Sequence, residues 1–193
     1  MKMGKVIVVT GTPGTGKTTL AIELAKDIGA NYLNVTEYVS KHVLQSRTDP
    51  ERRTKVVDVA KTRASLKREF KTVRGSSVVD THIPDAIIPK EIVRRVFVLR
   101  CHPMILEGRL RRKKWRANKI RENVLAEIVD SCLSAAVKYY GWRKVVQIET
   151  SRRSVRSCVG LAKRRLQPKP IRRIEIDWIS KLDKEGLLDR YIV

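Results

Sequence analysis

Apolar residues along the chain follow two patterns, short continuous runs and repeats at every third or fourth position. Short apolar runs of strand length, rich in β-branched residues, occur at residues 5–10, 32–35, 76–80, 96–99 and 145–148. Apolar residues between these runs recur three or four positions apart, as in amphipathic helices, at 17–29, 36–44, 58–74 and 152–166, from 103, and from 120. Strands that alternate with helices in this way form a parallel sheet covered on both faces. We therefore expect an α/β fold of three layers around five parallel strands.

Individual residues predict where some of these elements begin and end. Gly29 is placed to end the first helix, and Thr36 to begin the second as its N-cap. The following segment, 45–55, is polar, charged and interrupted by Pro50. Such a composition interrupts regular structure, so we expect this segment to be mobile.

The second half of the chain predicts one long helix and a separate end. From Ile120 the apolar positions form a single stripe that reaches residue 133. A Gln-Pro-Lys-Pro sequence at 167–170 then breaks the helical pattern. We divide the chain accordingly into one domain at 1–166 and a C-terminal extension at 167–193 that contains a short helix.

The sequence Gly-Thr-Pro-Gly-Thr-Gly-Lys-Thr-Thr at 11–19 lies between the first strand and the first helix. Two glycines separated by four residues and followed by Lys and Thr match the phosphate-binding P-loop, whose backbone N–H groups and helix dipole attract anions. We expect ATP to bind here, with Lys17 on the β and γ phosphates and the Thr18 hydroxyl on Mg²⁺. The phosphates would also contact Gly14, Gly16 and Thr19. The fold is then a P-loop NTPase; the alternative is a glycine-rich turn that only caps a helix.

A carboxylate follows the third predicted strand. Asp80 ends the run Ser-Ser-Val-Val-Asp at 76–80. The carboxyl ends of parallel strands border the ligand crevice in open α/β sheets. Asp80 is therefore a candidate for the nucleotide site, and an ordinary strand-end carboxylate is the alternative.

The composition adds a strong positive charge. The chain has 42 Lys and Arg against 20 Asp and Glu, for a net charge of +22. This excess favours an anionic partner such as RNA, although it is also compatible with a charge that only maintains solubility. Trp115 lies inside a cationic run at 111–116, a pattern that suits either nucleotide or RNA contact or local packing.

Cysteines and hydropathy exclude several other classes. Cys101, Cys132 and Cys158 include no Cys-x-x-Cys pair, so neither a disulfide framework nor a zinc site is indicated, and we expect reduced, mostly buried thiols. No apolar run approaches the roughly 18 residues of a membrane span, and the N-terminus leads into a strand. We expect a cytoplasmic protein without a membrane partner.

Four motifs together resemble a known family. They are the P-loop, the segment 49–58, the run Val-Val-Asp-Thr-His at 78–82 with Pro-Lys-Glu at 89–91, and a basic segment that leads into Lys-Ile-Arg-Glu-Asn at 119–123. Their order and spacing resemble atypical, adenylate-kinase-like nucleoside monophosphate kinases that act in assembly of the small ribosomal subunit in archaea and eukaryotes. The resemblance covers about residues 5–155.

The resemblance implies two moving elements and a catalytic pair. The monophosphate-binding segment corresponds to about 34–57 and the lid to about 112–122. Asp80 matches the family carboxylate that holds Mg²⁺ through water. His82 matches the group that positions an attacking water during ATP hydrolysis; a structural histidine is the alternative.

The resemblance also implies cationic contacts to nucleotide. Arg52 matches an arginine of the monophosphate site, and Arg152 falls where the loop after the last strand borders the adenine. The family lid has Arg-Gly-Tyr where this chain reads Lys113-Lys114-Trp115, so the family arginine is missing, and Lys113 and its neighbour Arg112 are the candidates for ATP contact. A solvated surface position is the alternative for Arg52 and Arg152.

The function implied by the resemblance is adenylate kinase activity, in which ATP and AMP give two ADP, together with ATPase activity and a role in maturation of the small ribosomal subunit. The implied partners are AMP or another nucleoside monophosphate, a platform protein of the small subunit and rRNA. One alternative is an assembly factor that is switched by nucleotide and has little kinase activity. Another is an RNA-binding module with a relic P-loop.

Overall fold

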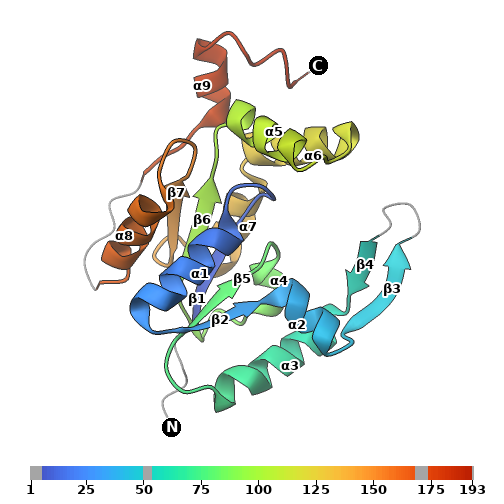
Figure 1. Ribbon diagram of the computed structural model, residues 1–193, viewed down its shortest axis with the longest axis vertical. Coiled ribbons are helices and arrows are strands. Elements are labelled where there is room, and N and C mark those ends of the chain that lie inside the picture. Colours follow the sequence, from blue (N-terminus) through green and yellow to red (C-terminus); the bar gives the residue numbers. More distant parts are fainter. Residues whose placement is uncertain (1–5, 50–53, 168–173, 193) are drawn as a thin grey trace.

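The computed structural model describes residues 6–49, 54–167 and 174–192. Its strands are β1 Val6–Gly11, β2 Asn31–Asn34, β3 Gln45–Asp49, β4 Thr54–Val57, β5 Ser77–Asp80, β6 Val93–Arg100 and β7 Val145–Glu149. Its helices are α1 Lys17–Ile28, α2 Val35–Lys41, α3 Val59–Thr72, α4 Pro84–Ile87, α5 Pro103–Arg112, α6 Ala117–Ile128, α7 Ser131–Tyr140, α8 Val155–Arg165 and α9 Trp178–Lys184. Strands and helices thus alternate along most of the chain (Figure 1).

Five of the strands form one parallel sheet in the order β2-β5-β1-β6-β7. The central strand β1 is buried along its whole length, because both of its faces are covered. Val6 and Val8 pack into the core on one face, and Ile7 and Val9 pack into the core on the other. The expected three-layer α/β P-loop fold with five parallel strands is therefore confirmed.

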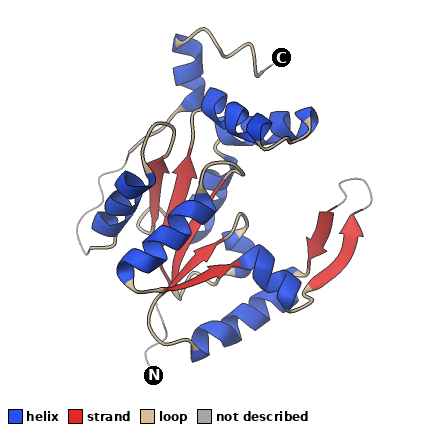
Figure 2. Ribbon diagram, viewed as in Figure 1, coloured by secondary structure: helices blue, strands red, loops and turns tan. Residues whose placement is uncertain are grey.

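Helices cover both faces of the sheet (Figure 2). One face packs against α1 and α8, through residues such as Leu24 and Ala162. The opposite face packs against α3 and α7, through residues such as Leu66 and Ala136. The three cysteines are free, and Cys101 and Cys158 among them are buried, as we expected from the sequence.

The prediction of one long helix from Ile120 onward is wrong, because the helix is interrupted between Ile128 and Ser131. Helices α6 and α7 are separate elements, and Asp130 between them has a left-handed backbone with φ of 57°. Asp tolerates this conformation better than most residues do, and its carboxylate accepts a hydrogen bond from Arg100. The apolar stripe is consequently divided: Ile128 and Leu133 pack into different clusters, and Val129 is exposed.

The segment that we expected to be mobile contains an antiparallel pair of strands, β3 and β4. The sequence did not predict this pair, because its polar composition lacks the alternation that marks a strand half-buried in a core. The preceding helix also begins earlier than predicted. The N-cap of α2 is Asn34 and not Thr36, since the Asn34 side chain accepts a hydrogen bond from the backbone N–H of Glu37.

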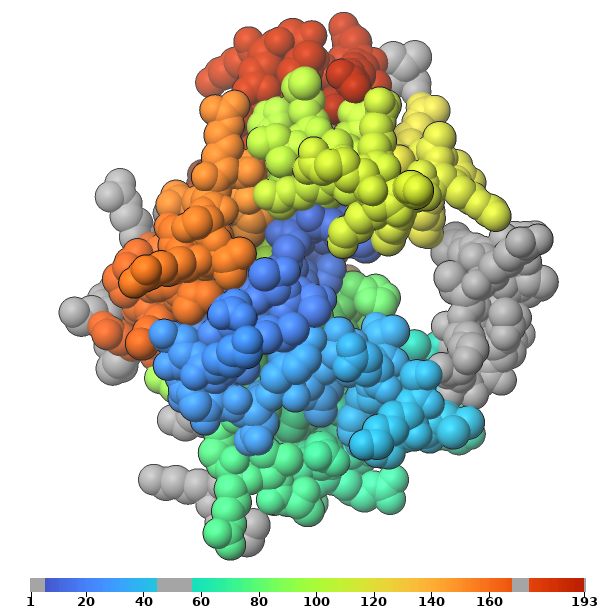
Figure 3. Space-filling model, in the orientation of Figure 1, coloured from blue at the N-terminus to red at the C-terminus, as the bar shows by residue number. Residues whose placement is uncertain are grey.

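Residues 174–192, which we call the C-terminal segment, contain the expected short helix, α9. Trp178 and Leu182 of α9 are buried, and Leu182 and Tyr191 join a third core cluster with residues of α5 and α6, including Leu110 and Val124. In the space-filling view this segment lies directly on α5 (Figure 3). In the part of the chain that is described, every helix is too short or too polar to cross a membrane.

Candidate nucleotide-binding site

The P-loop connects β1 to α1 and lies tightly against two neighbours. Gly11 has φ of +138°, and a Cβ added there would lie 2.5 Å from the carbonyl oxygen of Leu99 in β6. Gly14 has φ of +92°, and its added Cβ would lie 2.9 Å from side-chain carbons of Leu106 and Leu110 in α5. Only glycine fits both the backbone angles and the space. The loop is therefore fixed against β6 of the sheet and against α5.

Hydrogen bonds hold the loop in a closed turn. The Thr15 hydroxyl donates to the Thr12 carbonyl oxygen at 2.8 Å, and the Thr150 hydroxyl donates to the Thr15 carbonyl oxygen at 2.8 Å. Lys17 Nζ donates to the same Thr12 oxygen at 3.3 Å. The ammonium group thus lies over the loop, next to the first backbone N–H groups of α1, which have no partner inside the helix.

Electrostatics favour an anion beside Lys17. Burial lowers the pKa of its ammonium group from the usual 10.5, and the positive charge of Lys113 adds to this shift, while the Asp80 carboxylate opposes it. Lys113 is the C-cap of α5 and is exposed. A phosphate at this position would be attracted by both cations.

Oxygen ligands gather at the end of β5. The Thr18 hydroxyl donates to Asp80 Oδ2 at 2.6 Å, and the Asn34 amide donates to the same oxygen at 3.1 Å. Asp80 itself is 4 % exposed. A hydroxyl and a carboxylate in contact fit Mg²⁺, which binds through a few protein oxygens and substrate phosphates. The described residues contain no group of three or more His, Cys, Asp or Glu side chains that could hold a metal by themselves.

His82 follows β5 by two residues and has an exposed side chain. Partial burial of the ring and then the positive charge of Lys17 lower the pKa of His82 below the usual 6.5, and Asp80 opposes the shift. This shift favours the neutral imidazole. The structure thus brings Lys17, Thr18, Asp80 and His82 together, and the charge of Lys113 also acts on Lys17, while the role of each residue stays a prediction.

Of the other three predicted contact residues, two are exposed and one lies outside the described residues. Arg112 ends α5 next to Lys113 and is exposed. Arg152 is also exposed, but the cavity beside the P-loop is lined by the next residue, Arg153. Arg52 lies outside the described residues.

That cavity has a volume of about 220 Å³ and lies between the P-loop, α5 and the start of α8. Gly14, Thr19 and Thr150 line it together with Arg109. The Arg109 guanidinium donates to the backbone oxygens of Thr150 and Ser151, at 2.7 and 3.3 Å. Sequence reasoning missed Arg109, because nothing distinguishes it within a run of cations.

Comparison with known proteins agrees with this geometry. A protein-family profile described as an AAA domain matches residues 7–151. The chain belongs to this family of P-loop, kinase-like domains. Two relatives carry the name "Putative adenylate kinase". The one from Methanocaldococcus jannaschii is 31 % identical over 91 % of this chain and 93 % of its own, and the one from Pyrococcus abyssi is 32 % identical over 92 % and 93 %.

A solved structure confirms the fold of this AAA-domain protein. Shikimate kinase from Bacteroides thetaiotaomicron superposes with a TM-score of 0.54, over 84 % of this chain and 98 % of that chain. At 18 % identity this likeness concerns the fold alone. The family match ends before the C-terminal segment, which packs on α5 and α6.

A buried carboxylate beneath the P-loop connects the AAA domain to the C-terminal segment. Glu127 of α6 is 2 % exposed. One of its oxygens accepts from the Thr12 hydroxyl at 2.5 Å, and the other accepts from Arg100 Nε at 2.9 Å and from Trp178 Nε1 at 3.0 Å. The backbone N–H of Cys101 donates to this second oxygen as well. Glu127 therefore joins the P-loop, β6 and α9.

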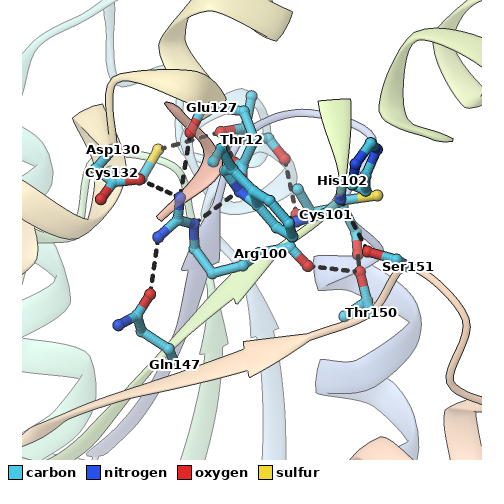
Figure 4. Close-up of polar contacts among 12 residues, drawn as sticks. Thr12, Arg100, Cys101, His102, Glu127, Asp130, Cys132, Gln147, Thr150 and Ser151 are labelled. Atoms are coloured by element: carbon cyan, nitrogen blue, oxygen red, sulfur yellow. Dashed lines mark hydrogen bonds and ion pairs between the residues drawn. The ribbon is translucent and has the colours of Figure 1, made fainter. Parts of the chain in front are cut away.

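The same cluster extends through Arg100 (Figure 4). Its guanidinium donates to Gln147 Oε1 at 2.7 Å and to the Asp130 carboxylate, and Gln147 in turn donates to the backbone oxygen of Ile174 at 2.8 Å. Sequence reasoning missed this cluster. In the sequence, only the position of the acidic Glu127 within the apolar stripe of its helix could have indicated this cluster.

Proposed function

We propose that the protein is an adenylate kinase that uses Mg²⁺-ATP to phosphorylate AMP, that it also hydrolyses ATP, and that it acts in maturation of the small ribosomal subunit. The P-loop, with Lys17 beside the pair Thr18 and Asp80, is the observation that carries the proposal. The names of the relatives support a kinase of nucleoside monophosphates. The ribosomal role rests on the motif resemblance and on the net charge of +22.

Each residue of the site has a role in this proposal. Lys17 binds the β and γ phosphates, with Lys113 and Arg112 approaching from the lid. Gly14, Gly16 and Thr19 bind phosphate oxygens through the loop. Thr18 and Asp80 would hold Mg²⁺, which neutralises phosphate charge when it is bound.

The phosphate of AMP and the adenine of ATP each have a proposed contact residue. Arg52 binds the phosphate of AMP. The adenine of ATP lies near Arg152, and the cavity lined by Arg109 and Arg153 supports this placement.

The decisive experiment combines a binding titration with a product assay. Ap5A, which joins two adenosines through five phosphates, is expected to bind as one molecule per chain and to inhibit formation of ADP from ATP and AMP. Omission of AMP should reduce ADP production to the slow rate of hydrolysis. An ADP signal that is independent of AMP, with no binding of Ap5A, would refute the kinase assignment.

A second function is favoured by the charge of the lid. Residues 111–116 contain five cations and are exposed. A nucleotide-switched assembly factor would use such a surface to hold rRNA and a platform ribosomal protein, with little kinase activity. Hydrolysis of ATP that increases when this protein and small-subunit rRNA are added, without a requirement for AMP, would favour the switch.

His82 separates hydrolysis from kinase activity. We expect His82→Ala to reduce ATP hydrolysis by about 10²-fold and AMP phosphorylation much less, since only hydrolysis needs a positioned water. Because the pKa of His82 is lowered, its ring gains a proton only at lower pH than an unperturbed imidazole does, and hydrolysis should decline at correspondingly lower pH. Both rates are measured between pH 5.5 and 8; equal losses in the two reactions would instead indicate a structural histidine.

A further inference from the structure

A second and larger cavity lies beside α5, on a different face of this helix from the one that packs on the P-loop. Its volume is about 650 Å³, within the range of ligand sites. Leu106 and Leu110 of α5 pack towards Gly14 of the P-loop, whereas Glu107 and Arg111 line this cavity. We call it the C-terminal cavity, because Arg190 and Tyr191 form one of its walls.

The cationic wall of the C-terminal cavity is held in place by one carboxylate. Glu107, with only 12 % of its side chain exposed, accepts from Arg111 at 2.5 Å and from Arg190 at 2.9 Å. The Tyr191 hydroxyl donates to it at 3.0 Å, and the Arg190 guanidinium lies 5.6 Å from the centre of the Tyr191 ring. Two arginines are thus ordered by one acid, and they keep N–H groups for an additional anion.

The remaining lining is apolar and aromatic. Ile120 and Val124 of α6 form a buried part of the wall, and Trp115 is 37 % exposed beside them. Arg121 also lines the cavity, and Arg111 and Arg190 together outnumber the single carboxylate of Glu107. A matching ligand therefore has a flat apolar face together with negative charge, as a nucleotide does.

The surroundings favour a polymer over a free nucleotide. From the cavity, the exposed cations Arg112, Lys113, Lys114 and Arg116 continue along the lid. A chain of regularly spaced phosphates can pair with several of these cations at once, and each pair releases counterions. A single nucleotide would leave most of them unused.

We propose that the C-terminal cavity binds one unit of a single-stranded RNA, with its base on Trp115 and its phosphate on Arg190 and Arg111. The inference rests on the proposed function only for the choice of RNA as the polyanion. It gives that partner a defined site, built jointly by the lid and the C-terminal segment and separate from the ATP site.

The test measures binding of a fluorescently labelled eight-nucleotide oligouridylate by anisotropy at several salt concentrations. Trp115→Ala is expected to weaken binding about tenfold to a hundredfold, as for loss of one stacked base. Arg190→Ala should weaken binding. It should also reduce the magnitude of the slope of log affinity against log salt by about 1, the change expected for loss of one phosphate contact. Thermal unfolding of each variant verifies its fold.

Matched controls carry the same changes elsewhere. Trp142→Ala removes another exposed tryptophan, and Arg68→Ala removes an exposed cation from α3, at the opposite end of the molecule (Figure 1). Neither change should alter binding by more than about twofold.

Three outcomes would overturn the proposal. Equal affinities of Trp115→Ala and Trp142→Ala would leave only a diffuse cationic surface. Competition by an oligoglutamate as effective as that by unlabelled RNA would indicate an acidic peptide site. Absence of measurable RNA binding at low salt would remove the partner altogether. None of these bears on the kinase proposal, which AMP-dependent ADP formation by the unsubstituted protein tests separately.

Discussion

Replacement of Lys17 by alanine is expected to reduce ADP formation from ATP and AMP, and ATP hydrolysis with it, by about 10²–10³-fold, the usual effect of removing one group that stabilises transition-state charge. Lys17 Nζ donates to the Thr12 carbonyl oxygen at 3.3 Å, and the Thr15 hydroxyl donates to the same oxygen, so the fold does not depend on Lys17. Burial lowers the pKa of Lys17, and a bound triphosphate would raise it again, because phosphate charge favours the ammonium form. The measurement is the initial rate of both reactions, with thermal unfolding as the check on folding.

Lys26→Ala is the matched control for this variant. Lys26 lies on the same helix, α1, with 70 % of its side chain exposed and an ion pair to Glu23. Its removal takes away the same charge and length without touching the P-loop, and both rates should remain within about twofold of the parent, since surface substitutions seldom disturb distant sites. A Lys17→Ala protein that retained more than about a tenth of the parental activity would contradict the assignment of the P-loop.

Elements governed by local chemistry were predicted well. Gly29 ends α1 with a left-handed backbone, and Pro103 opens α5, both at the predicted residues. The β-branched runs became the strands of the central sheet, because a strand buried on both faces needs little more than apolar side chains of the right shape. The P-loop was found from sequence for the same reason: its glycines and Lys17 act within a few residues of one another.

Features that depend on distant residues were missed. Apolar spacing alone cannot reveal the helix break at Asp130, whose carboxylate accepts from the Arg100 guanidinium 30 positions away. Arg109 similarly contacts the loop after β7, and Glu127 contacts β6 and α9. These partners are far away in the sequence. Such side chains differ from solvated charges only in their burial, and burial is a property of the assembled fold.

Glu127 gives these distant contacts a direct energetic test. Four groups donate to its carboxylate, and its principal partner, Arg100, is 1 % exposed. Truncation leaves a buried guanidinium with less countercharge and removes the acceptor for Thr12 and Trp178. Breaking a buried ion pair from one side costs about 3–5 kcal/mol.

We therefore expect Glu127→Ala to lower the free energy of unfolding by about 3–5 kcal/mol, and the midpoint of thermal unfolding by on the order of 10 °C for a chain of this size. Glu127→Gln keeps the shape and one acceptor oxygen, so its loss should be smaller. Glu122→Ala is the control, because this residue lies on the same helix with 57 % of its side chain exposed and pairs with Lys119 at the surface. Its cost should remain within about 0.5 kcal/mol. Urea and thermal unfolding supply both quantities. If the two alanine variants lost equal stability, Glu127 would be an ordinary helix residue, and the C-terminal segment would not be coupled to the P-loop through it.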